Sequence, residues 1–344
     1  MSKKVFGIDL GTNNIKIYKK GEGIVLDQKN AIAIANKKTL IAAGNEANEM
    51  YEKAPINISV SYPVKFGVIA EIEHMQMLLN HFLVDLIGKK NSLGTSNEFL
   101  IAVPTDITEV EKKSFHDLIA NSNAKSKTIG MVEKPLAAAL GMGLDIYHAH
   151  GILTVDSGSE TTEISILSLG GIVLSKLIPI GGRKIDESIK LFVKKRYNLV
   201  IGDRTSEYIK MNLVSAFPQE KESIFVCGRN VVTGLPCEME IFSEEINEVV
   251  NEHLISIIES VRVILERTPP EISADIYRSG IYLTGGTAKL RDFDKLFTHE
   301  TALKVNVAED PENTVANGLG ELVDNLGSNK LATNVIKTFS RRTK

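Results

Sequence analysis

Two stretches of the chain share one pattern of apolar and polar positions. In the first, an apolar run ends at Asp9 and Gly11, and a second apolar run follows over 14–18. In the second, an apolar run likewise ends at Asp156 and Gly158 before another begins. Each copy predicts a strand, a tight turn and a second strand. The repeat of the Asp9 pattern at Asp156 indicates two related α/β domains.

Between the two copies, apolar residues at helical spacing predict a helix over 73–87. Its buried stripe is expected to hold Met75, Leu78, Leu79, Phe82 and Leu86. A buried strand is predicted over 99–103, and Thr108 with Glu111 has the sequence of a capping box that opens the next helix. A short alanine-rich helix is expected over 131–141.

The second half of the chain contains the longest predicted helix. Residues 183–247 are expected to be helical and then to form a hairpin with its turn near 234–236. An amphipathic helix follows over 244–268 and stops before Pro270, because proline cannot continue it. A strand over 280–286 leads into a glycine turn and a helix.

Composition and charge exclude several classes of protein. Of 344 residues, 43% are hydrophobic and 24% are charged, and the formal net charge is −3. These values are typical of a folded globular protein and exclude a disordered chain or a bulk nucleic-acid binder. No apolar run is long enough to span a bilayer, and no signal peptide is evident, so we expect a cytoplasmic protein. Cys227 and Cys237 are expected to be reduced there, although a hairpin could bring them face to face.

An acid at the end of a buried strand, followed by a glycine turn and a hydroxyl, suits a site for phosphate and metal. Glycines let backbone N–H groups approach phosphate oxygens, and a carboxylate holds Mg²⁺ through water. One such turn is more often an ordinary β-turn. Two copies, with a third glycine turn at Gly285 and Gly286, favour a nucleotide triphosphate held from two sides. These turns match neither the P-loop nor the dinucleotide-binding glycine pattern.

The turns and several later segments together resemble the MreB family, the bacterial actins of the actin and sugar-kinase superfamily. The similar segments are 6–12, 103–112, 156–163, 168–173, 180–182, 195–202, 268–271 and 283–286. The resemblance runs collinearly from about Val5 to Gly327. It implies an actin-like α/β fold of two related ribonuclease-H-like domains, each with an inserted subdomain, and a nucleotide cleft between them.

The resemblance also implies domain boundaries. Domain I would cover 1–148 with an insertion at about 31–72. Domain II would cover 149–327 with an insertion at about 183–243. A basic tail would follow over 328–344.

By motif, the resemblance assigns ATP and Mg²⁺ to the cleft, with Asp9 and Asp156 around the metal. The nucleotide would be held by residues of the three turns and of one helix, namely Thr12, Asn13, Asn14, Lys16, Gly158, Ser159, Glu160, Glu207, Lys210, Gly285, Gly286, Thr287 and Ala288. Glu207 and Lys210 also fit a solvated ion pair at helical spacing. Lys16 also fits an exposed strand lysine.

The chain departs from the family at the position that orients the water attacking the γ-phosphate. Relatives usually carry a glutamate directly before the proline of this segment, and here the residue is Lys134. An ammonium cannot accept a proton from water, so hydrolysis is expected to be slow. Lys134 would either pair with phosphate or extend into solvent, and Glu133 would replace the missing group only after a local shift. Thr161, often assigned to water positioning in the family, is retained.

The second phosphate turn also departs from the family. Relatives usually have three glycines where this chain has Gly158, Ser159 and Glu160. The Glu160 carboxylate would repel a triphosphate unless it turns away or joins the metal shell. These departures resemble the divergent MreB paralogues of wall-less, helical, swimming bacteria.

The resemblance implies that the chain's main partner is itself. MreB subunits stack head to tail into protofilaments, which commonly pair antiparallel and lie on the inner membrane face. Other MreB paralogues are candidate partners, and nucleic acid is not expected. The loop 88–94 offers little apolar surface for a membrane, whereas the tail 329–344 holds five basic residues and no acids. The tail fits either an interfacial helix on an anionic membrane or a solvated end.

Three functions therefore remain open from the sequence. The first is a filament-forming cytoskeletal ATPase of weak turnover, involved in cell shape or motility. The second is a nucleotide-binding structural subunit with essentially no ATPase activity. The third is a small-molecule kinase of the same superfamily, which needs a carboxylate base and a sugar pocket that no segment resembles.

Overall fold

The computed structural model describes residues 3–36, 38–87, 96–217, 220–326 and 336–338. The chain divides into two compact units. Unit 1 consists of 1–150, 165–177 and 312–344, and unit 2 of 151–164 and 178–311. The break after His150 lies close to the expected boundary at 148. The division differs from the expected one further on, because 165–177 and the segment after Pro311 group with the first unit.

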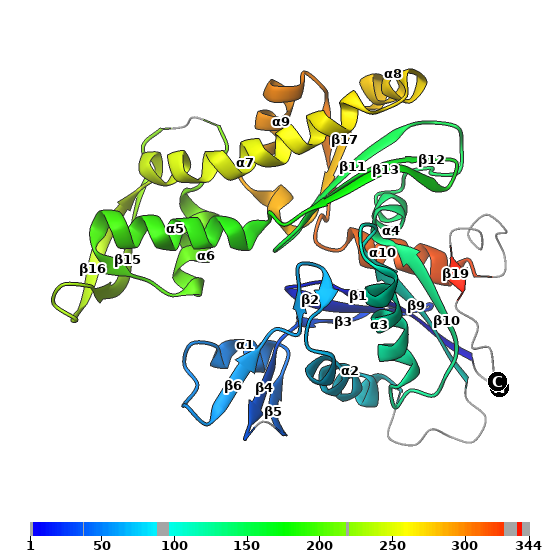
Figure 1. Cartoon of the computed structure of the whole chain (residues 1–344), viewed down its shortest axis with the longest axis horizontal. Coiled ribbons are helices and arrows are strands. Elements are labelled where there is room, and N and C mark those ends of the chain that lie inside the picture. The colour runs from blue at the N-terminus through cyan, green and yellow to red at the C-terminus, as the bar shows by residue number, and fades with distance from the viewer. Residues whose placement is uncertain (1–2, 37, 88–95, 218–219, 327–335, 339–344) are drawn as a thin grey trace. The chain divides into compact units, whose positions relative to one another are not determined.

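The two larger sheets share one strand order when the second is read in reverse, apart from one additional edge strand in the first (Figure 1). The first has the order β19 (Lys337–Thr338), β10 (Ser126–Glu133), β9 (Ser96–Val103), β1 (Lys3–Leu10), β2 (Asn14–Lys19) and β3 (Gly23–Lys29). The second has the order β13 (Gly171–Ile178), β12 (Thr162–Ser168), β11 (Ile152–Ser157), β17 (Ile281–Thr284) and β18 (Val305–Val307). Strands β10, β9 and β1 are mutually parallel, as are β18, β17 and β11. The repeat predicted from the Asp–Gly turns is therefore a repeat of whole sheets.

Helices α2 (Ile72–Ile87) and α3 (Glu109–Ala120) confirm two predictions from the sequence. The expected stripe of α2 is buried, except that Leu83 is more deeply buried than Leu86. At the start of α3, Glu111 Oε2 accepts from the Thr108 N–H at 2.7 Å, and the Glu111 N–H donates to Thr108 Oγ1 at 3.3 Å. These helices cover the core side of the first sheet, where Phe6 stacks on Phe99 with ring centroids 5.5 Å apart.

The chain between β3 and α2 forms a small insertion in unit 1. It contains β4 (Ile32–Ala35), β5 (Thr39–Ala43), α1 (Asn45–Met50) and β6 (Ile58–Ser61), followed by the short pair β7 (Val64–Lys65) and β8 (Val68–Ile69). The three-stranded sheet β5-β4-β6 packs on α1 through small side chains, among them Ala33, Ala42 and Ala47. This insertion lies within the range predicted at about 31–72.

Helices α4 (Lys134–Gly141) and α10 (Thr314–Asp324) pack against each other in unit 1. The helix predicted over 131–141 begins three residues later than expected, because Met131 and Val132 still pair with β9. A Cβ on Gly141 would overlap the carbonyl oxygen of Thr314, and a Cβ on Gly318 would overlap that of Ala137. Backbone-to-backbone packing of this kind explains why α10 belongs with the first unit rather than with the second.

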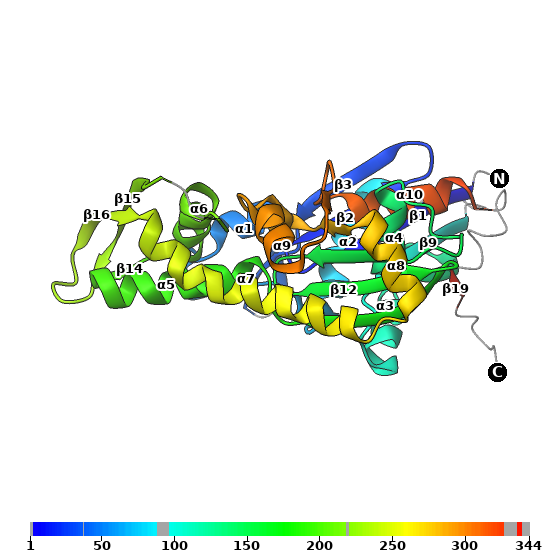
Figure 2. The ribbon, with the colours of Figure 1, turned by 90° about the horizontal axis from the view of Figure 1, so that it is seen from above.

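Unit 2 contains the remaining helices and a three-stranded sheet in the order β14-β15-β16. Its elements include α5 (Gly182–Tyr197), β14 (Leu199–Val200), α6 (Asp203–Leu213), β15 (Ser223–Asn230), β16 (Pro236–Phe242), α7 (Ser243–Glu266), α8 (Pro270–Ser279), the 3₁₀ turn η1 (Gly286–Lys289) and α9 (Phe293–Thr301). The long helix α7 runs along α5 and ends before Pro269, as the sequence predicts (Figure 2). The glycine turn after β17 (Ile281–Thr284) leads first into the 3₁₀ turn η1 and then into α9, so the predicted helix is present but begins only at Phe293.

The two cysteines lie on the paired strands β15 and β16. Cys227 is opposite Glu238, whereas Cys237 is opposite Gly228. Because neighbouring residues of a strand point to opposite faces, the two thiols lie on opposite faces of the hairpin. Both are free, and the alternative that the hairpin brings them face to face is wrong.

No helix in the described part of the chain is long and apolar enough to cross a membrane. The proposed membrane loop 88–94 lies outside the described residues. So does the tail 329–344, apart from 336–338.

We predict that Gly318→Ala destabilises the protein by about 1–3 kcal/mol or more, because the added methyl group must separate α10 from α4. Chemical unfolding measures the change, with Asn317→Ala on the exposed side of α10 as the control. The control should stay within about 0.5 kcal/mol of the parent protein. Equal stability of the two variants would contradict the close packing of α4 and α10.

Candidate functional site

The first Asp–Gly turn joins β1 to β2 and is closed by the backbone and by one buried amide. The Gly11 N–H donates to the Asn14 carbonyl at 2.9 Å. Asn30 is fully buried, donates from Nδ2 to the Gly11 carbonyl at 2.8 Å and from its own N–H to the Asn13 carbonyl at 2.9 Å. Sequence reasoning missed Asn30, because nothing in a lone asparagine after β3 indicates that it folds back on this turn.

Lys134 is paired with the acid of this turn. Its Nζ lies 3.0 Å from Asp9 Oδ1 and donates to the Leu10 carbonyl at 3.4 Å. The side chains of Lys134 and Asp9 are only 13% and 12% exposed. The expectation that Lys134 extends into solvent is therefore wrong.

Glu133 lies on the other side of the same sheet. In the register of β1, β9 and β10, Asp9 and Val132 both align with Ala102, whereas Glu133 aligns with Val103. Aligned residues share a face and successive residues alternate. The register therefore directs Glu133 away from the face that carries Asp9, and this favours a loss rather than a transfer of the water-orienting carboxylate.

Lys16 and Asn14 have partners of their own within unit 1. Lys16 is 4% exposed, and its Nζ donates to the Glu312 carbonyl and lies 3.9 Å from Asp27 Oδ2. Asn14 donates from Nδ2 to Asp27 Oδ1 at 2.7 Å. The alternative of an exposed strand lysine is wrong, and a phosphate would have to compete with these contacts for Lys16.

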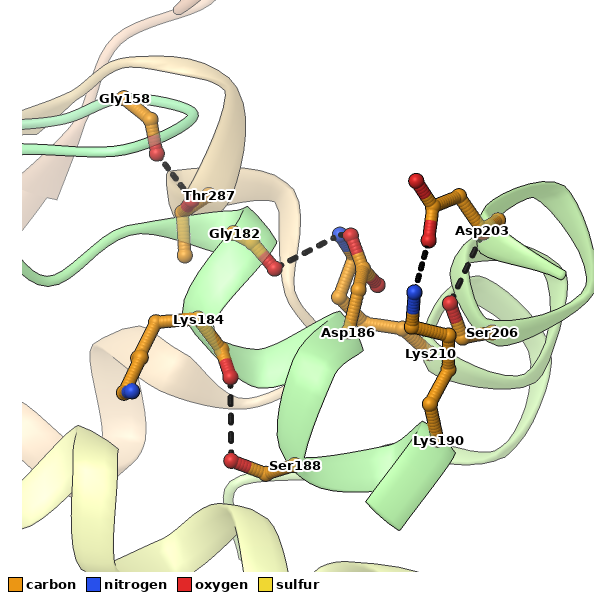
Figure 3. Close-up of polar contacts among 10 residues, drawn as sticks. All are labelled: Gly158, Gly182, Lys184, Asp186, Ser188, Lys190, Asp203, Ser206, Lys210 and Thr287. Carbon is orange, nitrogen blue, oxygen red and sulfur yellow. Dashed lines mark hydrogen bonds and ion pairs between the residues drawn. The ribbon is translucent and has the colours of Figure 1, made fainter. Parts of the chain in front are cut away.

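The second Asp–Gly turn is held by the beginning of α5. The N–H groups of Gly182 and Arg183 donate to the carbonyls of Gly158 and Ser159 at 3.0 and 2.7 Å. From η1, Thr287 Oγ1 donates to the Gly158 carbonyl at 2.8 Å (Figure 3). The candidate residues Gly158, Ser159 and Thr287 therefore lie together, as predicted.

The third turn packs directly on the second. Gly285 has a φ of 85°, which favours glycine, and its N–H donates to the Pro311 carbonyl at 2.9 Å. A Cβ at Gly285 would overlap Asp156 Oδ1 and the Ser157 carbonyl oxygen. This contact places Asp156 beside the candidate Gly285, and the candidates Gly286 and Ala288 follow in η1.

Glu160 is paired with an arginine that sequence reasoning missed. Arg183 Nη1 lies 2.8 Å from Glu160 Oε1, and the Glu160 side chain is 12% exposed. This ion pair gives the Glu160 carboxylate a counter-charge from the chain itself. Thr161 closes the same turn by accepting from the Gly158 N–H at 2.8 Å.

Two crossed ion pairs join α5 to α6 (Figure 3). Lys210 lies 2.8 Å from Asp186 and donates to the Gly182 carbonyl at 3.2 Å, and Lys190 pairs with Asp203. Burial raises the pKa of Asp186 above its ordinary value, and Lys210 opposes that rise. The alternative of a solvated pair between Glu207 and Lys210 is wrong for Lys210, whose ion pair crosses to the other helix.

No group of three or more His, Cys, Asp and Glu side chains that could hold a metal occurs within the described ranges. Asp156 fits the predicted role beside a metal by its place between the second and third turns. Asp9 fits it poorly, because Lys134 already balances its charge.

Comparison with known proteins identifies the family. The sequence model of the MreB/Mbl protein family matches residues 3–331. The chain belongs to the MreB/Mbl family. It is 40% identical to the cell shape-determining protein Mbl of Bacillus cereus over 95% of this chain and 97% of that protein. It is 39% identical to the cell shape-determining protein MreB of Escherichia coli over 92% of each chain.

Solved structures confirm the actin-like fold expected for an MreB/Mbl protein. MreB5 of Spiroplasma citri bound to AMPPNP superposes with a TM-score of 0.88 at 32% identity, over 95% of this chain and 98% of that one. The double helical filament of MamK gives a TM-score of 0.75 at 20% identity, over 93% and 98%. The second likeness supports the fold alone.

We predict that Lys210→Met destabilises this MreB/Mbl protein by about 3 kcal/mol, since it leaves the buried Asp186 without its counter-charge. Lys210 opposes the rise that burial causes in the pKa of Asp186, so its removal raises that pKa further, and the loss should grow as the pH rises and Asp186 ionises. Thermal unfolding at about pH 5 and about pH 8 measures both effects, with a smaller loss at the lower pH.

The exposed Lys195 on α5 supplies the matched control for this prediction. Lys195→Met should unfold like the parent protein at both pH values. A Lys210→Met variant that also unfolds like the parent protein would contradict the buried ion pair.

Proposed function

We propose that the chain is a bacterial cytoskeletal protein that binds ATP and polymerises into protofilaments, with slow hydrolysis. The observation that carries this proposal is the pair of matching sheets, each ending in an Asp–Gly turn, in a member of the MreB/Mbl family. Each of these turns would serve as a phosphate-binding turn.

Nucleotide binding is supported by the second turn and by a relative. The Gly158–Glu160 turn has its backbone fixed by α5 and η1, so it is shaped before a ligand arrives. MreB5 of Spiroplasma citri has been solved with AMPPNP and with ADP. The residues predicted from the sequence to bind the nucleotide, with Glu207 and Lys210 among them, would then border it. Mg²⁺ would accompany it near Asp156.

Slow hydrolysis follows from the identity and place of Lys134. A water molecule attacking the γ-phosphate needs an acceptor for its proton, and an ammonium has no acceptor. Glu133 aligns with the opposite face of the sheet. The subunit would therefore hold ATP longer than a relative with glutamate at this position, and filaments would turn over slowly.

Assembly and location are proposed from the family alone. Subunits would stack head to tail and pair antiparallel, with other MreB paralogues as further partners. The filaments would lie in the cytoplasm at the inner membrane face, where the basic tail 329–344 would meet anionic lipid. Their task would be cell shape or motility.

The second candidate function is a nucleotide-binding structural subunit without meaningful hydrolysis. The ion pair between Lys134 and Asp9 favours it, because the cation is held in place rather than left to move aside. A small-molecule kinase is disfavoured, because Glu133, the carboxylate beside Lys134, aligns with the far face of the sheet.

We predict that the protein sediments in the presence of ATP above a critical concentration, and that it stays in the supernatant without nucleotide. Ultracentrifugation over a range of protein concentrations, with electron microscopy of the pellet, measures this. Protein that never sediments but transfers phosphate to a sugar would replace the cytoskeletal proposal by the kinase.

We also predict a low rate of phosphate release from Mg-ATP under polymerising conditions and a rise of at least about tenfold in Lys134→Glu. The rise is expected because the carboxylate restores a proton acceptor beside the nucleotide. Lys127→Glu, on the exposed part of β10, is the matched control and should leave the rate unchanged. A fast parent protein, or no gain in Lys134→Glu, would show that another group orients the water.

A further inference from the structure

We propose that Lys134 is a built-in counter-cation of the first phosphate turn, which lets this chain bind a nucleotide triphosphate without a divalent cation. This inference rests on the nucleotide binding proposed above and adds which cation balances the phosphate charge. It concerns a residue type that distinguishes this chain from relatives with glutamate at the same position.

The ammonium of Lys134 is fixed at the base of the turn. It lies 3.0 Å from Asp9 Oδ1 and 3.4 Å from the Leu10 carbonyl oxygen. Asp9 Oδ1 is buried and makes no hydrogen bond, so the neighbouring ammonium supplies its charge balance. Lys134 is the first residue of α4, which α10 holds in place through Gly141 and Gly318. A charge on so constrained a backbone lies in place before any ligand binds.

This arrangement does not suit a hydrated divalent cation at Asp9. Magnesium keeps several waters and binds proteins through one or two carboxylates, so it needs room and an unbalanced negative charge. At Asp9 the charge is already balanced, and an ammonium beside the carboxylate would repel the metal ion. Lys134 would have to move before Asp9 could join a metal shell.

In the second turn, which lies in unit 2, the acid is likewise paired with a cation of the chain itself. Glu160 has its counter-charge from Arg183 at 2.8 Å. Asp9 and Glu160 therefore both have cations supplied by the chain itself. A triphosphate meets much less repulsion from such turns than from turns whose acids rely on bound metal.

Lys16, in its observed conformation, cannot act as the counter-cation of the first turn. Its Nζ donates to the Glu312 carbonyl and lies 3.9 Å from Asp27 Oδ2, so its charge is committed on another side. Lys134 is thus the lysine whose ammonium borders the turn itself.

Equilibrium binding of ATP, measured by calorimetry with excess Mg²⁺ and again with EDTA, tests the proposal. The parent protein should bind with dissociation constants that differ by less than about tenfold between the two conditions. Lys134→Met should lose about 10- to 100-fold in affinity in EDTA, the range for a lost contact to a charged group, and much less in Mg²⁺. Lys134→Arg should behave as the parent protein, and the exposed Lys127→Met is the matched control.

The possible results separate the inference from the function on which it rests. Binding that the parent protein loses in EDTA as completely as Lys134→Met overturns the inference alone. Absence of binding even with Mg²⁺ overturns the proposed nucleotide binding as well. Lys134→Arg preserves the charge, so its binding in EDTA supports or refutes the proposal even where Lys134→Met does not fold.

Discussion

The ion pair between Asp9 and Lys134 sets the character of the first phosphate turn. It joins the end of β1 to the beginning of α4 with a separation of 3.0 Å between charged atoms. Its place depends on the packing behind it, where Gly141 and Gly318 bring α4 and α10 into backbone contact. Compared with a glutamate at this position, Lys134 has no proton acceptor and brings a positive charge that is held in place. The proposed binding of ATP without rapid hydrolysis rests on this difference in chemistry.

Unit 2 balances its buried acids in the same way. Glu160 in the second turn takes Arg183, and Asp186 takes Lys210. The cations come from α5 and α6, whose crossed pairs also keep the two helices in register. Because α5 donates its first N–H groups to Gly158 and Ser159, the helix that supplies the charge also shapes the turn.

The sequence predicted the local elements well. The two strand–turn–strand copies, the stripe of α2 and the capping box at Thr108 depend on neighbours within a few residues, and all are present. It did not predict the partners of Lys134, Lys16 or Glu160. Those contacts join residues 125, 296 and 23 positions apart in the chain, which is beyond the reach of local sequence patterns.

Three other features of the structure could not be predicted from the sequence either, because each depends on contacts that sequence spacing does not reveal. Cys227 and Cys237 lie near each other in the sequence, but the register of β15 and β16, rather than their spacing, puts them on opposite faces. Helix α10 follows unit 2 in the chain and packs with unit 1, because small residues on α4 accept it. Asn30 closes the first turn from the far end of β3, and a lone amide gives no pattern by which to find it.

The central claim is that the Lys134 ammonium balances Asp9 in the nucleotide-bound protein. A crystal structure with a non-hydrolysable ATP analogue, grown without divalent cations, tests it most directly. The account predicts Lys134 Nζ between Asp9 and a phosphate oxygen, within hydrogen-bond distance of both. A Lys134 side chain turned away from Asp9, with a solvent cation in its place, would contradict it.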